Sequence, residues 1–158
     1  MDFADVTSIL SNYSNTLLKG KIAHEEIAPY RAKYPDLKSL SPKIAAVLVL
    51  LYPIKNETHC VLIERSTYQG QHSGQISFPG GKKEKNDTNI FETAIREAWE
   101  EININKKDIK IVGKLSKLYI PPSNFEVTPV LAFSKNQPNF IPNKREVVEI
   151  LEVKIKDL

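Results

Sequence analysis

An apolar run at residues 44–52 limits the possible folds more than any other feature, since it contains no charged residue and is rich in branched side chains. A strand with one wet face alternates apolar and polar residues, whereas a continuous apolar run is typical of a strand buried on both faces. The polar segment 53–58 then predicts a turn, and residues 59–64 predict the antiparallel partner strand. This strand pair is expected to lie inside a layered domain.

Further elements follow from the spacing of apolar residues. An N-terminal helix is predicted over residues 6–17 and a longer helix over residues 89–102. Additional strands are predicted at residues 109–119, 126–133 and 147–155. Strands around one central helix predict an α+β or α/β sandwich. The length of 158 residues leaves room for one domain with a proper core.

The predicted helix at residues 89–102 carries two separate stripes of side chains. Five apolar residues fall together as a core stripe, while Glu97, Glu100 and Glu101 fall on another face at spacing i, i+3 and i+4. Like charges at this spacing cost an isolated helix a few tenths of a kcal/mol per pair, roughly, and a bound cation would offset that cost. Glu92 lies off this face and is expected to close a capping box with Asn89.

The three glutamates leave two interpretations open. Ligand sets made only of oxygen favour hard cations, which predicts Mg²⁺ or Mn²⁺ as the cofactor and phosphate as its companion. The alternative is a solvated acidic face whose charges pair with Arg96 or with lysines. The upstream segment Ser77-Phe78-Pro79-Gly80-Gly81-Lys82-Lys83 favours the metal. Its glycines let the backbone approach a ligand closely and its lysines can meet anionic oxygen, although an ordinary strand-to-helix turn would also use Gly-Gly.

The segment 81–104 resembles the Nudix box, whose core is Arg-Glu, two residues, Glu-Glu, here Arg96 to Glu101. One extra residue separates the glycine from the arginine, and Asp87 stands where the standard box has its first glutamate. Asn103 replaces the glycine at the end of the helix, where asparagine also tolerates a left-handed cap. The resemblance implies the Nudix fold, an α/β/α sandwich with a mixed sheet and the catalytic helix packed on it. It also implies a Nudix domain at 42–158 that follows an N-terminal helical extension at 1–41.

The chain is also similar to the coenzyme A pyrophosphatase branch of that family. The similar residues stand before the box and are Leu62, Arg65, Ser66, Gly74 and Phe78-Pro79-Gly80-Gly81. Gly70 stands where the branch carries its second arginine. Residues 121–129 resemble the substrate-side strand and loop of these enzymes. The family fold would close with a further C-terminal helix, which this chain, ending at Leu158, is expected to lack.

The resemblance assigns roles to individual residues. Glu97, Glu100 and Glu101 would be catalytic and would hold the metal together with the Gly81 carbonyl, and Glu100 or Glu101 would orient or deprotonate the attacking water. Substrate would be bound by Arg65, Lys82, Gly80 and Gly81.

Several neighbouring residues receive weaker assignments. Arg96 is expected to pair with Asp87 or Glu84 rather than with substrate. Glu146 is a candidate additional acid. His72 could form a hydrogen bond to a phosphate, although a lone histidine in a loop is more often structural or solvated. Trp99 is expected to pack against another element.

The leading expectation is therefore hydrolysis of coenzyme A or its derivatives to adenosine 3′,5′-bisphosphate and 4′-phosphopantetheine. One alternative keeps the chemistry on another nucleoside diphosphate derivative, such as ADP-ribose, a dinucleotide or a sugar nucleotide. A second is a Nudix-like domain that binds a nucleotide without cutting it. The net charge of +3 comes from lysines spread along the chain, which argues against nucleic acid as the partner.

The expected partner is a small nucleotide, and a homodimer is a possible assembly. The single cysteine, Cys60, rules out an internal disulfide and fits a reducing compartment. The first residues lack the layout of a secretory signal, and the longest apolar run is too short to cross a bilayer. A cytoplasmic location is therefore expected.

Overall fold

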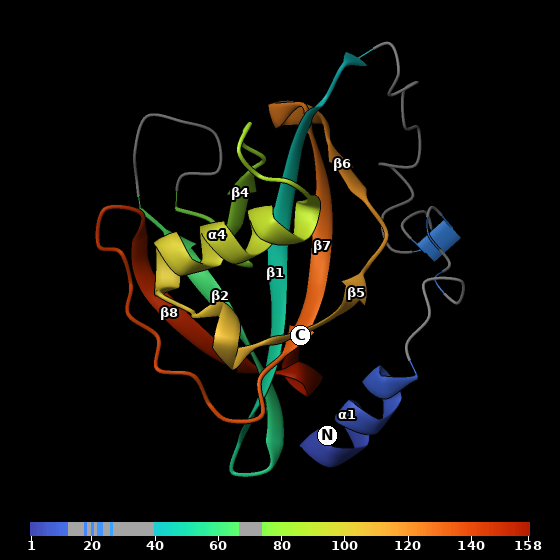
Figure 1. Cartoon of the computed structure of the whole chain (residues 1–158), viewed down its shortest axis with the longest axis vertical. Coiled ribbons are helices and arrows are strands. Elements are labelled where there is room, and N and C mark those ends of the chain that lie inside the picture. The colour runs from blue at the N-terminus through green and yellow to red at the C-terminus, as the bar shows by residue number, and fades with distance from the viewer. Residues whose placement is uncertain (13–17, 19, 21, 24–25, 27–39, 67–73) are drawn as a thin grey trace.

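The computed structural model of the protein describes residues 1–12, 18, 20, 22–23, 26, 40–66 and 74–158. Within these residues eight strands form one mixed sheet around the predicted apolar strand (Figure 1). The strands are β1 (Lys43–Ile54), β2 (Glu57–Arg65), β3 (Ile76–Ser77), β4 (Gly80–Lys82), β5 (Lys110–Lys114), β6 (Leu118–Ile120), β7 (Phe125–Phe133) and β8 (Val147–Lys154). The predicted α+β fold with a mixed sheet is confirmed.

Strand β1 is the centre of the sheet because it pairs with three other strands. It runs parallel to β7 over the whole length of that strand, from Lys43 beside Phe125 to Leu51 beside Phe133. It pairs antiparallel with β2 near its end and with β4 near its start. Strand β8 pairs with β2, while β5 and β6 pair with β7. The short strand β4 is thus fixed to the central strand of the sheet.

The connection between β1 and β2 is tighter than the predicted turn at residues 53–58. Strand β1 continues to Ile54 and β2 begins at Glu57, so Lys55 and Asn56 alone form the turn. Both residues have positive φ angles, 48° and 66°. A two-residue hairpin turn of this hand matches the natural twist of the two strands. The predicted antiparallel pairing is confirmed, and the wider turn was wrong.

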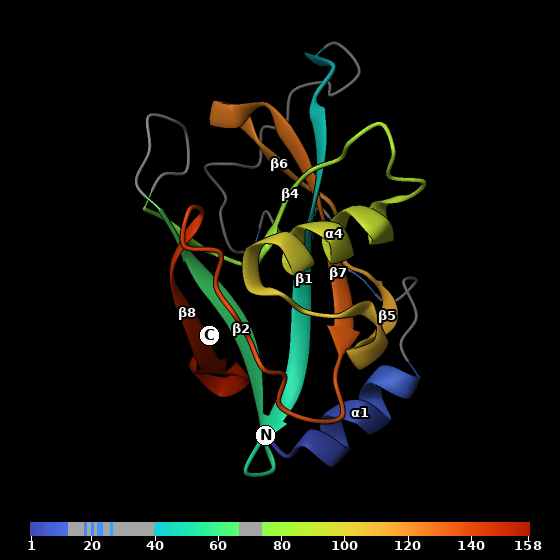
Figure 2. The same ribbon diagram turned by 60° about the vertical axis from the view of Figure 1, so that its left-hand side comes forward.

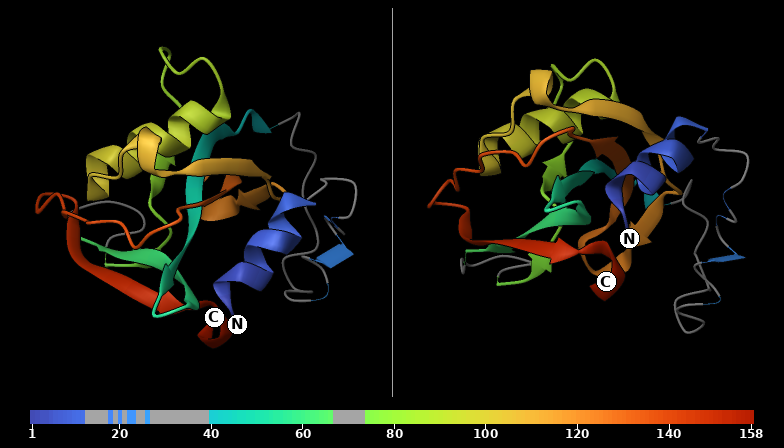
Figure 3. Two further views of the ribbon diagram at one scale, coloured as in Figure 1. Left: turned by 60° about the horizontal axis from the view of Figure 1, so that its bottom comes forward. Right: turned by 90° about the horizontal axis from the view of Figure 1, so that it is seen from below.

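Two helices cover opposite faces of the sheet (Figures 2 and 3). Helix α4 (Ile90–Ile102) buries Ala94, Ala98 and Ile102 against one face of β1 and β7. Helix α1 (Phe3–Ser11) lies on the other face, where Val6 joins a cluster with side chains of β1, β2 and β7. Of the predicted N-terminal helix, residues 13–17 lie outside the described residues. The two helix layers confirm the α/β/α sandwich.

The last predicted strands differ in detail from the observed ones. The predicted strand at 109–119 is split into β5 and β6, and it is preceded by a 3₁₀ turn, η3 (Lys106–Asp108). A second 3₁₀ turn, η4 (Pro121–Ser123), separates β6 from β7, and η5 (Ile155–Asp157) follows β8.

No helix within the described residues is long and apolar enough to cross a membrane.

Candidate active site

Both ends of helix α4 carry the capping residues that the sequence predicts. Asn89 is the N-cap, and its Oδ1 accepts hydrogen bonds from the backbone N–H groups of Phe91 and Glu92 at 3.0 and 3.1 Å. Asn103 ends the helix in a left-handed conformation, with φ 59° and ψ 31°, as predicted. The expected capping box needs a correction, because the Glu92 carboxylate accepts from the N–H and hydroxyl of Thr88, one residue before the cap.

The Gly80–Gly81 pair lets the helix and the sheet approach each other closely. A Cβ atom on Gly80 would collide with the backbone of Ala46 and Val47 on β1. A Cβ atom on Gly81 would instead collide with the carboxylate of Glu97 on α4. The Glu97 carboxylate therefore rests directly on the Gly81 backbone, and the two predicted site elements meet at β4.

Glu101 is the most enclosed of the three glutamates, with no exposed surface. One carboxylate oxygen lies 2.6 Å from Arg65 Nη1, and the other accepts from Gly80 N–H at 2.8 Å. Burial raises the pKa of Glu101 to about 7, although Arg65 and the Gly80 N–H both act to lower it. Arg65 and Gly80, which were predicted as substrate-binding residues, thus lie within hydrogen-bonding distance of a predicted metal ligand.

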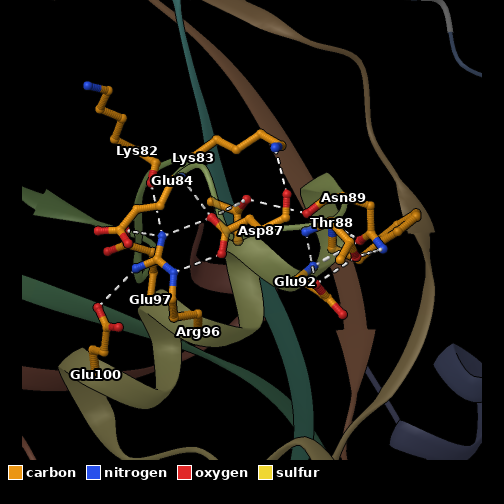
Figure 4. Close-up of polar contacts among 12 residues, drawn as sticks. Lys82, Lys83, Glu84, Asp87, Thr88, Asn89, Glu92, Arg96, Glu97 and Glu100 are labelled. Carbon is orange, nitrogen blue, oxygen red and sulfur yellow. Dashed lines mark hydrogen bonds and ion pairs between the residues drawn. The ribbon is translucent and has the colours of Figure 1, made fainter.

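Arg96 connects helix α4 to the loop that lies between β4 and this helix (Figure 4). Its guanidinium donates to both Asp87 carboxylate oxygens, at 3.0 and 3.1 Å, which confirms the predicted pairing with Asp87. It also forms ion pairs with Glu97 at 2.9 Å and Glu100 at 3.0 Å. Hydrogen bonding to Arg96 holds the pKa of Asp87 well below its usual range despite its burial. The alternative partner, Glu84, instead donates its backbone N–H to Asp87 at 2.8 Å.

The three glutamates differ in exposure although they share one face of the helix. The Glu100 side chain is 40% exposed, that of Glu97 is 15% exposed, and that of Glu101 is fully buried. Burial is the main cause that raises the pKa of Glu97, and the neighbouring charges of Glu100 and Glu146 raise it further against the opposing effect of Arg96. Of the three, Glu100 is therefore the carboxylate most accessible to solvent.

Glu146 is brought to this site from the loop before β8. Its influence on the pKa of Glu97 indicates that the two carboxyl groups lie close enough to interact. Asn143 Nδ2 donates to the Glu146 carboxylate at 3.2 Å, and the Asn143 backbone N–H donates to the Glu101 carbonyl at 2.9 Å. Asn143 thus ties this loop to the end of α4. Asn143 could not be predicted from the sequence, because its role depends on a contact between distant segments.

A pocket of about 370 Å³ opens beside β4 on the sheet face opposite α4. All four predicted substrate-binding residues, Arg65, Gly80, Gly81 and Lys82, line it. Its other walls are mostly apolar and come from β1, β7 and the segments next to them; they include Ala45, Val47, Phe78, Ile120, Phe125 and Val127. The pocket therefore has a cationic rim beside the glycines and an apolar interior.

The remaining sequence expectations have different outcomes. Trp99 was expected to pack against another element, but 56% of its surface is exposed, because it lies on the side of α4 away from the sheet. His72 and Gly70 lie outside the described residues.

Thr93 is a site residue that the sequence reasoning missed. It is fully buried, and its hydroxyl donates to Asp87 at 3.0 Å. A threonine that makes such a hydrogen bond cannot be recognised from the sequence, since threonine is common in helices without this role.

The donor chemistry of the site fits a hard divalent cation in part. The available donors are carboxylate oxygens, which is the ligand type that Mg²⁺ and Mn²⁺ prefer. Within the described residues, however, no three His, Cys, Asp or Glu side chains form a group that could hold a metal ion. Glu97 and Glu100 are both paired with Arg96, and Glu101 with Arg65. Arginines therefore balance the carboxylate charges in this structure.

Solved structures with a similar architecture show the fold class. The Nudix hydrolase RenU of M. smegmatis superposes with a TM-score of 0.61 at 21% identity, covering 74% of this chain and 75% of that one. An Ap4A hydrolase of C. elegans also gives a TM-score of 0.61 at 22% identity, covering 73% of this chain and 82% of that one. The architecture is the Nudix fold.

Sequence comparison places the chain within that class. The NUDIX domain model matches residues 42–158, and the chain belongs to the Nudix family. Enzymes of this family hydrolyse pyrophosphate bonds and generally use divalent metal cations. The chain is 40% identical over 113 residues to the uncharacterized Nudix hydrolase NudL of Pectobacterium atrosepticum. The match covers 72% of this chain but 58% of that relative, so the chain spans little more than half of its length.

Proposed function

We propose that this protein is a divalent-metal-dependent hydrolase that cuts the pyrophosphate bond of coenzyme A or its derivatives. The observation that carries the proposal is the meeting at β4 of two predicted features. The carboxylate of Glu97 rests on Gly81 and that of Glu101 bonds to Gly80. The same glycines line the pocket that contains Arg65 and Lys82. Acids and cations thus flank one strand, as hydrolysis of a metal-bound pyrophosphate requires.

Each residue has a distinct role in this proposal. Glu97, Glu100 and Glu101 would hold the metal with help from the Gly81 carbonyl, and the ion would supply charge neutralisation and make water more acidic. Glu100 is exposed and so is the carboxylate best placed to orient or deprotonate the attacking water. Glu101 is enclosed by Arg65 and Gly80, which fits a role in holding the ion, and its raised pKa also keeps it a candidate for proton transfer.

The arginine contacts suggest how the site is kept intact without the metal. Arg96 would release Glu97 and Glu100 to a bound cation while keeping its two hydrogen bonds to Asp87. Its position would change little, because Asp87 is itself held by Thr93 and by the backbone of Glu84. Arg96 is therefore proposed as a residue that positions the box and does not contact substrate.

Glu146 is proposed as an additional acid of the site. Its charge acts on Glu97, and its place before β8 is held by Asn143. The carboxylate would add a ligand or a base to those of α4.

Support for coenzyme A comes from the residues shared with the coenzyme A pyrophosphatase branch. Arg65 and the segment Phe78–Gly81 belong to that pattern, and all of them except Pro79 line the pocket. A second candidate is another nucleoside diphosphate derivative, such as ADP-ribose or a dinucleotide. Gly70 in place of the arginine of the branch favours it, and a solved structure with this fold is described as an Ap4A hydrolase.

Hydrolysis of a substrate panel tests the proposal. The panel contains coenzyme A, acetyl-coenzyme A, ADP-ribose, NADH, diadenosine polyphosphates and nucleoside triphosphates, each with Mg²⁺ or Mn²⁺, and products are resolved by chromatography. Coenzyme A is expected to be cut preferentially, with release of adenosine 3′,5′-bisphosphate, and chelation of the metal is expected to stop the reaction. Preference for another compound would overturn the substrate and keep the chemistry. Binding of nucleotides without cleavage of any compound would overturn the hydrolase itself.

A further inference from the structure

The pocket beside β4 has a cation near it that the proposed reaction does not use. Strands β1 and β7 run parallel here, with Lys43 beside Phe125 and Ala45 beside Val127. Alternate residues of a strand point to the same face. Lys43 therefore projects on the same face as Ala45, Phe125 and Val127, all of which line the pocket.

The Lys43 ammonium group lies over an aromatic ring. Its Nζ atom lies 5.6 Å from the centroid of the Phe125 ring, within the range of a cation–π contact. Lys43 is exposed, and no ion pair joins it to a carboxylate in the part of the chain that the structure describes. Arg65, by contrast, is bonded to Glu101. Lys43 is thus a cation beside the pocket with its charge available to a ligand.

Distance along β1 separates Lys43 from Gly80, where the pyrophosphate would lie. Gly80 lies beside Val47 and Lys82 beside Ala45 in the β1–β4 register. At about 3.3 Å per residue, Lys43 is roughly 13 Å along the strand from Val47. A ligand that holds its pyrophosphate at Gly80 and fills the apolar pocket would therefore reach Lys43 with its far end. The apolar and aromatic walls suit a nucleoside base, since such rings stack on bases of any sequence.

We propose that Lys43 is a specificity-determining residue that binds a phosphate on the nucleoside half of the substrate, outside the bond that is cut. The inference rests on the proposed function only for the place of the pyrophosphate. A lysine ammonium is a compact, hydrated charge suited to a phosphate group. The substrate class is accordingly a nucleotide whose ribose carries an additional phosphate.

Equilibrium binding of two ligands that contain no pyrophosphate tests this role without any turnover. Isothermal titration calorimetry would compare adenosine 3′,5′-bisphosphate with adenosine 5′-monophosphate at low ionic strength, where exposed charges are least screened. The wild-type protein is expected to bind the bisphosphate about tenfold more tightly, which corresponds to about 1.4 kcal/mol. In Lys43→Gln this preference should fall to about one, while the affinity for the monophosphate stays unchanged.

Two further variants separate charge from structure. Lys43→Arg keeps the cation and is expected to retain most of the preference. Lys110→Gln is a matched control, because Lys110 Nζ lies 5.7 Å from the centroid of the Phe133 ring at the opposite end of β7. It should bind both ligands as the wild type does. Thermal unfolding of each variant verifies that the fold is kept.

The outcomes distinguish this inference from the proposed function. A preference that persists in Lys43→Gln, or a wild-type protein that binds both ligands equally, overturns the role of Lys43. Failure to cut coenzyme A in the substrate panel overturns the proposed reaction instead. A preference that depends on Lys43 would stand even then, because the two test ligands cannot be hydrolysed at a pyrophosphate.

Discussion

Glu100 is the site carboxylate whose removal should separate catalysis from folding. Its side chain is 40% exposed, and it pairs with Arg96 one helical turn away, at spacing i, i+4. Such an exposed pair contributes only about a few tenths of a kcal/mol to helix stability. Glu100→Gln is therefore expected to lower the metal-dependent rate at least about 100-fold, by analogy with the loss of other charge-stabilising groups. Its melting temperature should stay close to that of the wild type.

The control for this variant is Glu149→Gln, which changes an exposed glutamate on β8. Steady-state kinetics with Mg²⁺ and a thermal melt would be measured for both proteins. Near-normal rates in a folded Glu100→Gln protein would contradict its assignment as a metal or water ligand.

The two glycines of β4 should respond differently to alanine. In Gly80→Ala the new Cβ meets the backbone of Ala46 and Val47, which cannot move without disturbing the central strand. A loss of about 2 to 4 kcal/mol of unfolding free energy is expected, in the range for overpacking and backbone strain. In Gly81→Ala the Cβ meets the carboxylate of Glu97, the flexible end of a side chain that can turn aside.

Gly81→Ala is thus expected to stay folded and to lose activity because Glu97 is displaced. Chemical denaturation and kinetic assays on both variants would separate the two effects. The opposite pattern, with a stable Gly80→Ala and an unfolded Gly81→Ala, would show that the contacts of β4 are assigned the wrong way round.

At the scale of residues, the sequence predicted which acids lie together but not how exposed each would be. A helical wheel places Glu97, Glu100 and Glu101 on one face, yet their exposures range from none to 40%. The difference arises because β4 and Arg65 enclose one side of that face, which is a tertiary contact. Trp99 shows the same limit, since the wheel separates it from the core stripe without indicating what covers it.

At the scale of elements, the junction between α4 and the loop that precedes it depends on Asp87. Its carboxylate is 6% exposed and accepts hydrogen bonds from Arg96, from Thr93 and from the Glu84 backbone. Asp87→Asn keeps the shape but removes the charge, so a loss of about 2 to 3 kcal/mol of unfolding free energy is expected at neutral pH.

The same substitution should remove a dependence of stability on pH. The folded-state pKa of Asp87 is lowered below its unfolded value of about 3.9, so its stabilising contribution is complete above that pH and is lost as the pH falls through the folded-state pKa. The difference between wild type and Asp87→Asn should therefore be constant from about pH 5 to 7 and shrink below about pH 4. Urea denaturation at pH 7, 5 and 3.5 would measure it, and a gap that does not change with pH would contradict the mechanism.

Elements with strong periodicity or clear end signals were predictable. Helix α4 was found within one residue of its observed start because Asn89 is an N-cap. Strands β3 and β4 were not found, because they span two and three residues and owe their form to pairing with β2 and β1. So short a strand has no period that a sequence can show.

At the scale of the whole molecule, one buried side-chain oxygen of the described residues lacks a hydrogen bond of standard geometry. Tyr52 is fully buried and packs edge-on against Phe140, with ring centroids 5.4 Å apart. Its hydroxyl makes no hydrogen bond of standard geometry in the described part of the chain, although the nearby Glu152 carboxylate adds to burial in raising its pKa. Because a buried hydroxyl without a partner costs free energy, Tyr52→Phe is expected to leave stability unchanged or raise it by up to about 1 kcal/mol.

Tyr119→Phe is the matched control, since the Tyr119 hydroxyl donates to Asn124 at 3.0 Å. It should lose about 1 kcal/mol. Thermal and urea unfolding of the two variants would make the comparison. A clear loss in Tyr52→Phe would show that its hydroxyl is satisfied, for example by bound water.

The parallel contact between β1 and β7 has a consequence for the order in which the molecule folds. Lys43 pairs with Phe125, so the chain must close a loop of about 80 residues before these strands meet. The hairpin of β1 and β2 and the helix α4 need only local contacts and can form early, whereas long-range pairing is slow. Strand β4 and the three glutamates lie between β1 and β7 along the chain, inside that loop. Refolding experiments should therefore recover helical signal before enzymatic activity, with a lag equal to the time of sheet closure.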